Sequence, residues 1–255
     1  MSKLLMPGIS VGVLGPLRAD RDGRPLALRS ERQRTLLGLL ALGAAEPVSR
    51  ARLTEAMWGA DEPANAGNAL QVQVSRLRAK LLASEPGVLA ATPRGYRLEL
   101  PSDRCDLLAF RTLVAEARTA APGDACDRYR EALCLWRGET VADVEPLHDS
   151  PEAAALAEER IAAVFGLRAA AHAIGRSAVA VPYLLPLAAD RPLHGALHAE
   201  LMIALAAAGR QADALDVFAT IRRRLAEEPG LDPDPQLGVA LRRILRRRPA
   251  SAARP

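Results

Sequence analysis

The chain is poor in aromatic residues and almost free of lysine. Phe, Tyr and Trp together make up 3% of its 255 residues, and Lys3 and Lys80 are the only lysines among 34 basic residues. Aromatic side chains favour strands, so their scarcity beside abundant Ala and Leu favours a mainly helical protein. The preference for arginine suits contacts with phosphate and guanine better than lysine would.

Cysteine and long apolar runs are also scarce. The chain holds Cys105, Cys126 and Cys134, an odd number without C-x-x-C spacing. This pattern argues against a disulfide framework or a zinc site and is typical of a reducing compartment. No uncharged apolar run reaches the length of a membrane span, and the first residues form too short an apolar run for a signal peptide. We therefore expect a cytoplasmic protein without membrane contact.

Motifs for catalysis and for bound cofactors are missing. The sequence has no G-x-S-x-G elbow, no G-x-x-x-x-G-K-[ST] phosphate loop and no H-E-x-x-H. His194 and His198 have the i, i+4 spacing of a metal pair. A packing or surface role is favoured for them, because a zinc site needs three or four ligands. We expect no enzymatic activity, no cofactor and no metal.

Charge is distributed unevenly along the chain. Residues 1–102 carry 14 basic and 9 acidic side chains (net +5), and residues 103–241 carry 14 basic and 21 acidic ones (net −7). The segment from residue 242 adds six arginines and no acid. An acidic surface repels phosphate, so nucleic acid is expected to contact the N-terminal part. The C-terminal arginines are expected to be solvated.

Residues 8–102 have the pattern of a winged helix-turn-helix with leading strands. Asp22-Gly23 is a hairpin-turn signal between the strands expected from Ser10 to Leu28. Ser30 and Gln33 are spaced as a capping box for a first helix. These features predict an α+β domain of the kind that follows receiver domains in response regulators.

The rest of this domain is expected to hold two more helices and a wing. Ser49 follows a short extended connector and is placed to cap the second helix, which stops at Gly59. A third helix is expected over 68–83 and a hairpin over 88–100, with Gly95 supplying a positive φ at its turn.

From residue 106 onward the patterns are helical. They predict helices over 106–119, 124–137, 152–174, 177–189, 194–208, 211–228 and 235–247. Gly175-Arg176 recurs 34 residues later as Gly209-Arg210, which is the period of the tetratricopeptide repeat. The fold class is therefore mainly α: the winged helix, an all-α tetratricopeptide-like domain over 103–248, and a disordered tail over 249–255. Tyr129 and Trp136 are expected in the core of one helix.

The third helix has the pattern of a base-reading helix. Leu70, Val74, Leu77 and Leu81 form one narrow apolar stripe at 100° per residue, which predicts the buried face. The residues expected to reach bases are Asn68, Gln71, Val72, Ser75 and Arg76. Arg can pair with guanine, Asn or Gln with adenine, and Val with a thymine methyl. An ordinary solvated helix face remains the alternative.

A second set of residues is expected to contact the DNA backbone or the minor groove. Arg94 at the hairpin tip is the predicted wing contact. The predicted backbone contacts are Arg32, Arg34, Arg50, Arg52, Arg78, Lys80 and Thr92.

The chain resembles the Streptomyces antibiotic regulatory protein family. The resemblance rests on Asn68–Arg78, Leu53–Gly59 and Gly95–Leu98, and, in the second half, on Ala132–Gly138 and Glu227–Pro233. It implies an OmpR-type winged helix followed by a bacterial transcriptional activation domain. It also implies an activator that binds direct repeats as side-by-side protomers and recruits RNA polymerase holoenzyme, typically at antibiotic gene clusters, and a short member without an ATPase module.

The sequence thus predicts a nucleoid-associated, sequence-specific transcriptional activator without enzymatic activity. The alternative is a tetratricopeptide-like interaction scaffold that binds nucleic acid without specificity.

Overall fold

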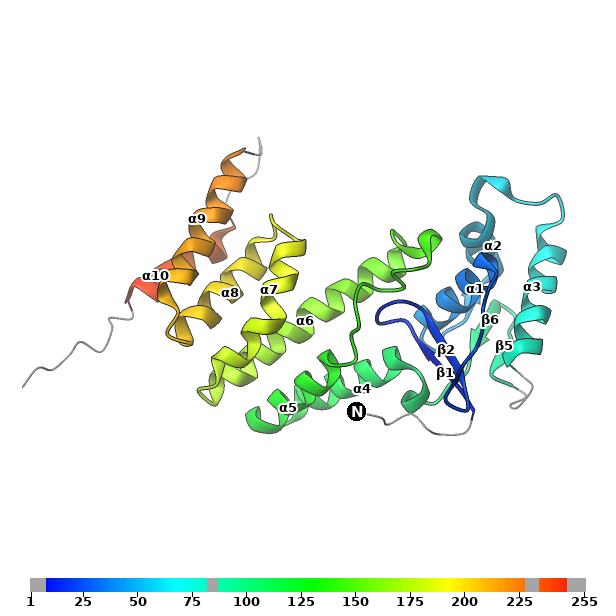
Figure 1. Cartoon of the computed structure of the whole chain (residues 1–255), viewed down its shortest axis with the longest axis horizontal. Helices are drawn as coiled ribbons and strands as arrows, with labels where there is room; N and C mark the ends of the chain where they lie inside the picture. Colours follow the sequence, from blue (N-terminus) through cyan, green and yellow to red (C-terminus); the bar gives the residue numbers. More distant parts are fainter. Residues whose placement is uncertain (1–7, 82–86, 228–233, 247–255) are drawn as a thin grey trace, which may run out of the picture. The chain divides into compact units, whose positions relative to one another are not determined.

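The computed structural model describes residues 8–81, 87–227 and 234–246, and it is mainly helical with two small antiparallel sheets, as predicted (Figure 1). The chain forms two compact units, and neither is continuous in sequence. The first combines the residues up to 115 with 131–159, and the second combines 116–130 with the residues from 160 onward. The predicted domain limits at 102 and 103 stay a prediction. The predicted tail over 249–255 lies outside the described residues.

The first unit opens with an antiparallel sheet of three strands, β1 (Ile9–Gly12), β2 (Arg18–Arg21) and β3 (Arg24–Pro25). Asp22 and Gly23 join β2 to β3 with φ angles of 52° and 75°. A two-residue turn with both φ angles positive matches the right-handed twist of the flanking strands. The predicted hairpin turn is confirmed.

Three helices follow: α1 (Glu31–Leu42), α2 (Arg50–Trp58) and α3 (Ala66–Leu81). The Ser49 hydroxyl accepts a hydrogen bond from Arg52 N at 3.1 Å, and Gly59 ends α2 with a φ of 52°, both as predicted. The predicted capping box on α1 is wrong. The Ser30 hydroxyl makes no capping bond, and Gln33 is buried in the protein instead of bonding back to Ser30.

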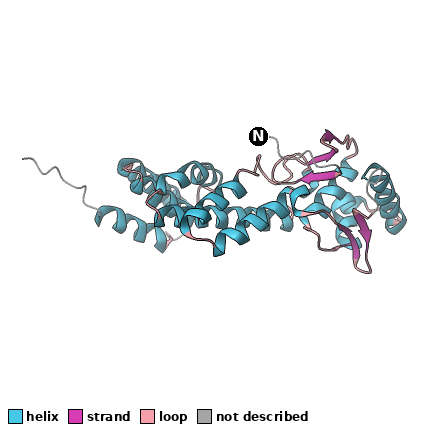
Figure 2. Cartoon of the chain, turned by 90° about the horizontal axis from the view of Figure 1, so that it is seen from below, coloured by secondary structure: helices cyan, strands magenta, loops and turns pink. Residues whose placement is uncertain are grey.

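A second sheet has the strand order β4-β6-β5. Figure 2 shows the strands in magenta among the helices. It consists of β4 (Val48–Ser49), β5 (Leu89–Ala91) and β6 (Gly95–Leu98), so the connector before α2 is itself a strand. Gly95 does not have a positive φ, so the prediction that it supplies one at the turn is wrong. Glycine is needed there for a steric reason, because a Cβ would lie 1.9 Å from the Val48 carbonyl oxygen.

Residues 131–159 also belong to the first unit. The Asp106 carboxylate, at the start of α4 (Asp106–Thr119), accepts hydrogen bonds from Val13 N at 2.8 Å and Leu14 N at 3.1 Å. Arg137 donates its backbone N–H to the Leu14 carbonyl oxygen at 2.7 Å. Asp106 and Arg137, both far from β1 in the sequence, are therefore bonded to the residues that follow β1.

One helix in this region is shorter than predicted. Helix α5 (Pro122–Leu133) ends before Trp136, because the chain turns toward Leu14 at Arg137. Trp136 packs edge-on against Phe110 with ring centroids 5.6 Å apart, in the first unit, whereas Tyr129 lies in the second. The prediction that Tyr129 and Trp136 share a helix is wrong.

The second unit contains α5 up to residue 130 and α6 (Pro151–Ala173) from residue 160. These are followed by α7 (Val181–Asp190), α8 (Gly195–Ala207), α9 (Gln211–Glu227) and α10 (Pro235–Arg246). Apart from α5, each of these helices lies within a few residues of its predicted range. Helix α8 packs against α7, α9 and α10, and most of its residues are buried. No helix of the described residues is long and apolar enough to cross a bilayer.

The 34-residue sequence echo corresponds to two equivalent helix ends. Gly175 and Gly209 follow α6 and α8 with φ angles of 70° and 80°. The backbone N–H of Arg176 bonds to Ala171 O and that of Arg210 to Leu205 O, five residues back in both cases. Each glycine also bonds three residues back, which completes a Schellman motif at both places. The repeat spacing therefore marks a repeated helix–turn–helix.

Candidate nucleic-acid interface

Helix α3 buries one stripe and exposes the opposite face. Leu70, Val74, Leu77 and Leu81 are its buried residues, as the periodicity predicts. The predicted base-reading residues are all exposed: Asn68, Gln71, Val72, Ser75 and Arg76. Asn65 anchors the start of this face, because its side-chain oxygen accepts a hydrogen bond from Asn68 N at 3.1 Å.

Two residues on this face differ from those of an ordinary solvated helix. Val72 is 39% exposed although it is apolar. Arg76 is exposed and has no carboxylate partner within the described parts of the chain. An exposed guanidinium beside an exposed methyl-bearing residue can recognise a guanine edge and a thymine methyl together.

The wing is a tight hairpin with a basic tip. Thr92 and Gly95 exchange backbone hydrogen bonds of 2.9 and 3.2 Å, and Gly95 N also bonds to the Thr92 hydroxyl at 3.1 Å. Thr92 therefore closes the turn, while Arg94 is exposed between Pro93 and Gly95. This arrangement presents a single guanidinium at the end of a short rigid loop.

Three of the predicted backbone arginines lie against aromatic rings. The guanidinium carbon of Arg32 lies 5.7 Å from the Trp58 ring centroid. Those of Arg50 and Arg78 lie 5.7 and 5.9 Å from the Tyr96 ring centroid. An aromatic ring orients a cation without neutralising its charge, so these guanidinium groups keep a full positive charge.

Two other predicted arginines are engaged by carboxylates of the first unit. Arg52 makes two hydrogen bonds to Glu152, at 2.9 and 2.8 Å. Arg34 forms an ion pair with Asp143 and donates to its backbone oxygen at 3.0 Å. Their positive charges are largely compensated inside the protein, so the first unit offers fewer arginines to phosphate than the sequence alone predicts.

Lys80 has a partner within the protein as well. Its ammonium group donates a hydrogen bond to the Ala27 carbonyl oxygen at 3.3 Å. A single bond to a carbonyl leaves the charge and two donors available. Lys80 therefore stays among the predicted backbone contacts.

Sequence reasoning overlooked Trp58 and Tyr96 as neighbours of the predicted arginine contacts. The chain has only two tryptophans and three tyrosines. Trp58 and Tyr96 lie in α2 and β6, close in sequence to predicted arginine contacts. The rarity of aromatic residues in this chain is the signal that could have identified them. It also overlooked Asp143 and Glu152, for which the sequence around them gives no indication.

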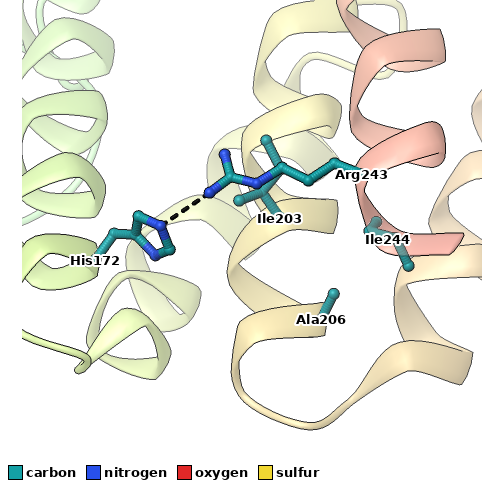
Figure 3. A pocket seen from close by; sticks show the side chains of 5 residues that line it. All are labelled: His172, Ile203, Ala206, Arg243 and Ile244. Atoms are coloured by element: carbon teal, nitrogen blue, oxygen red, sulfur yellow. Dashed lines mark hydrogen bonds between the residues drawn. The ribbon is translucent and has the colours of Figure 1, made fainter. Parts of the chain in front are cut away.

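The second unit offers a small, mostly apolar pocket. His172, Ile203, Ala206, Arg243 and Ile244 line it, and the Arg243 guanidinium donates to His172 Nε2 at 2.8 Å (Figure 3). His172 Nδ1 lies 3.0 Å from the Ser177 hydroxyl, so the ring is held between two partners. The polar groups at this pocket are thus mainly bonded to each other.

The histidine pair of α8 has structural roles. His194 Nδ1 caps the helix by accepting a hydrogen bond from Leu197 N at 3.3 Å. His198 is buried, with Nδ1 3.0 Å from the His194 carbonyl oxygen. Among the described residues no group of three or more His, Cys, Asp or Glu side chains is placed to hold a metal ion.

Comparison with protein families identifies both halves of the chain. Residues 23–98 match the model of the C-terminal domain of transcriptional regulatory proteins, and residues 105–245 match that of the bacterial transcriptional activator domain. The second match alone covers more than half of the chain.

Several curated proteins are similar over nearly the whole chain. Regulatory protein DnrI of Streptomyces peucetius is 33% identical over 94% of this chain and 93% of its own length. Regulatory protein AfsR of Streptomyces coelicolor is 39% identical over 94% of this chain. This chain spans 24% of AfsR and 65% of the transcriptional regulatory protein EmbR of Mycobacterium tuberculosis.

A solved structure shares the fold. The structure of Mycobacterium tuberculosis EmbR in complex with a low-affinity phosphopeptide superposes with a TM-score of 0.81 at 32% sequence identity, over 96% of this chain and 67% of that one. With both family models and the full-length similarity to DnrI, it leads to one conclusion. The chain belongs to the Streptomyces antibiotic regulatory protein family, which joins an OmpR-type winged helix to a bacterial transcriptional activator domain.

Proposed function

We propose that this chain is a sequence-specific DNA-binding transcriptional activator. Asn68, Gln71, Val72, Ser75 and Arg76 read base edges from α3, and Arg94 contacts the minor groove from the wing. The backbone contacts come from Arg32, Arg50, Arg78 and Lys80. Arg34 and Arg52 are left out of this set because they form ion pairs with Asp143 and Glu152.

The observation that carries the proposal is the exposed face of α3. It combines an exposed valine, an arginine without a carboxylate partner in the described structure, and two amide side chains over a fully buried apolar stripe. Such a face matches the hydrogen-bonding groups and methyl groups of the major groove. It sits in the positively charged part of the sequence, which favours approach to DNA.

We further propose that protomers bind side by side on direct repeats and recruit RNA polymerase holoenzyme at the promoter of an antibiotic biosynthetic cluster. Family membership supports this assignment, which implies that the protein works at the nucleoid. Direct repeats call for protomers in the same orientation, whereas a palindrome would demand a two-fold dimer.

Selection of duplexes from a random pool by the full chain, followed by affinity measurements on the selected sequence, tests the proposal. Enrichment of a repeated motif is expected. Arg76→Ala should lose about 1–3 kcal/mol on that motif, roughly 5- to 150-fold, and much less on unrelated DNA. Arg118→Ala, an exposed arginine of the second unit, is the matched control and should bind like the wild type.

The competing function is an interaction scaffold with unspecific nucleic-acid binding. It is favoured if no motif is enriched, or if Arg76→Ala leaves discrimination between selected and unrelated DNA unchanged. Footprints on the selected promoter with and without RNA polymerase address recruitment separately. A footprint that polymerase neither extends nor strengthens would contradict activation by recruitment.

A further inference from the structure

One aromatic ring in the first unit contacts arginines from two helices. Tyr96, in β6, is only 5% exposed, and the guanidinium carbons of Arg50 and Arg78 lie 5.7 and 5.9 Å from its ring centroid. Both distances are within the range of cation–π attraction. Arg50 is the first residue of α2 and Arg78 lies in the last turn of α3, so both helices meet at the wing strand.

Backbone pairing fixes the ring in this place. Val48 pairs with Tyr96 and Ser49 with Gly95 in the antiparallel β4-β6 ladder. Ser49 also caps α2, so the strand pairing brings Tyr96 next to the start of that helix. On the other side, Arg78 Nε donates a hydrogen bond to the Leu89 carbonyl oxygen of β5 at 3.0 Å.

The ring holds these two cations without compensating them. Neither Arg50 nor Arg78 has a carboxylate partner in the described parts of the chain. Arg52, two residues after Arg50, differs in this respect because Glu152 neutralises its charge. Two like charges directed to one neutral ring leave a local excess of positive charge. A phosphate group is the ligand chemistry that this excess favours, and the adjacent N-terminus of α2 adds to it.

We propose that Tyr96 is a positioning residue for the DNA backbone: its ring holds Arg50 and Arg78 in the orientation in which they contact phosphates. The inference rests on the proposed DNA-binding function and deepens it. Ordering a long arginine side chain lowers its entropy, and this loss opposes binding unless the side chain is already ordered. A ring that orders two arginines in the free protein therefore strengthens binding to any DNA sequence.

The slope of log K against log salt concentration tests this role, because it counts the phosphate contacts. Binding of the full chain to a mixed-sequence duplex of unrelated sequence is measured between 50 and 200 mM NaCl. Tyr96→Leu should weaken binding about tenfold and make the slope shallower by about 1 to 2. Tyr96→Phe keeps the ring and should restore wild-type affinity and slope.

Two controls separate positioning from folding. Leu98→Ala removes a buried side chain from the same strand and leaves the aromatic ring of Tyr96 in the chain. It should lower the melting temperature and leave the slope unchanged. In an Arg50→Ala/Arg78→Ala background, Tyr96→Leu should have no further effect on DNA binding, because the ring then has no arginine to position.

The outcomes are distinguishable. If Arg50→Ala and Arg78→Ala reduce the slope but Tyr96→Leu does not, Tyr96 has no positioning role. If Tyr96→Phe is as weak as Tyr96→Leu, the hydroxyl is responsible and the proposal is overturned. If both arginine variants keep the wild-type slope, the proposed backbone contacts themselves fail.

If Tyr96→Leu does not fold, substitution of Arg50 and Arg78 tests the positioning role of the ring without a change in the buried Tyr96. Lysine keeps the charge but stacks less well on a ring, so Arg50→Lys/Arg78→Lys should lose about fivefold or more in affinity. Wild-type affinity in this variant would overturn the proposal.

Discussion

Arg52 and Glu152, 100 residues apart in sequence, form a two-bonded ion pair with N–O distances of 2.9 and 2.8 Å. Their side chains are 25% and 28% exposed, so the pair is partly shielded from water. It ties the start of the second helix of the winged helix to the start of α6. Together with Asp106 and Arg137, it makes residues 131–159 a structural part of the first unit.

Removing this pair should destabilise the first unit. Arg52→Ala and Glu152→Gln should each lower the free energy of unfolding, with a coupling of about 1 kcal/mol in a double-mutant cycle measured by urea denaturation. Glu55→Gln is the matched control, because Glu55 also contacts Arg52 but is 71% exposed. Additive single-mutant effects would show that the two residues do not stabilise each other.

The ion pair between Arg52 and Glu152 should stabilise the folded chain less in acid. The hydrogen bond from Arg52 is the main cause that lowers the pKa of Glu152 in the folded chain. A lowered carboxyl pKa stabilises the folded state fully above the unfolded pKa, roughly 4.3, and this stabilisation is lost as the pH falls through the folded value. Unfolding free energies between pH 6 and 3 should therefore converge for wild type and Glu152→Gln. A constant difference down to pH 3 would contradict this.

Gly95→Ala should be severely destabilising. The added methyl group would lie 1.9 Å from the Val48 carbonyl oxygen, so β4 and β6 would have to separate. We expect a loss of about 3 kcal/mol or more, seen as a lower melting temperature. Gly67→Ala is the control: it lies in α3 with open space around it, and should stabilise by roughly 0.5–1 kcal/mol. Equal melting temperatures for the two variants would count against the strand pairing.

His198 should make the second unit sensitive to mild acid. Burial is the main cause that lowers its pKa in the folded state. Below roughly pH 6.5 the unfolded chain binds a proton that the folded chain still excludes, so stability present above that pH is lost as the pH falls. His198→Gln should flatten the unfolding free energy between pH 7.5 and 5.5. His194→Asn, which can still cap α8, should keep most of the dependence.

The cysteines should differ in reactivity. Burial raises the pKa of the Cys105 thiol to about 11. It also raises the pKa of Cys126, whereas Cys134 is exposed. Because the thiolate is the reactive form, a disulfide reagent at pH 8 should label Cys134 in the native protein, and the other two only after unfolding in urea. Fast native labelling of Cys105 would contradict its burial.

Features that depend on local periodicity were predictable from the sequence. The apolar stripe of α3 is buried as predicted, because four residues at helical spacing leave a single face to bury. The two glycines 34 residues apart end equivalent helices, because only glycine adopts a positive φ there without strain. The exposure of Asn68, Val72 and Arg76 follows from the same periodicity.

Features that depend on distant contacts were not predictable in this way. The need for glycine at position 95 comes from Val48, 47 residues earlier, and nothing in the turn itself indicates it. The end of α5 is set by Arg137 bonding to Leu14. Arg34 and Arg52 looked like free phosphate contacts, because Asp143 and Glu152 reach them only in the folded chain.

Because residues 131–159 belong to the first unit, domains cannot be exchanged between family members at a single junction. A chimaera that joins the winged helix of one family member to the helical domain of another at residue 102 would pair Leu14, Arg34 and Arg52 with foreign counterparts of Asp106, Asp143 and Glu152. The segment to be exchanged is therefore discontinuous: it comprises the residues up to 115 together with residues 131–159. Recombination should favour grafts that carry both pieces.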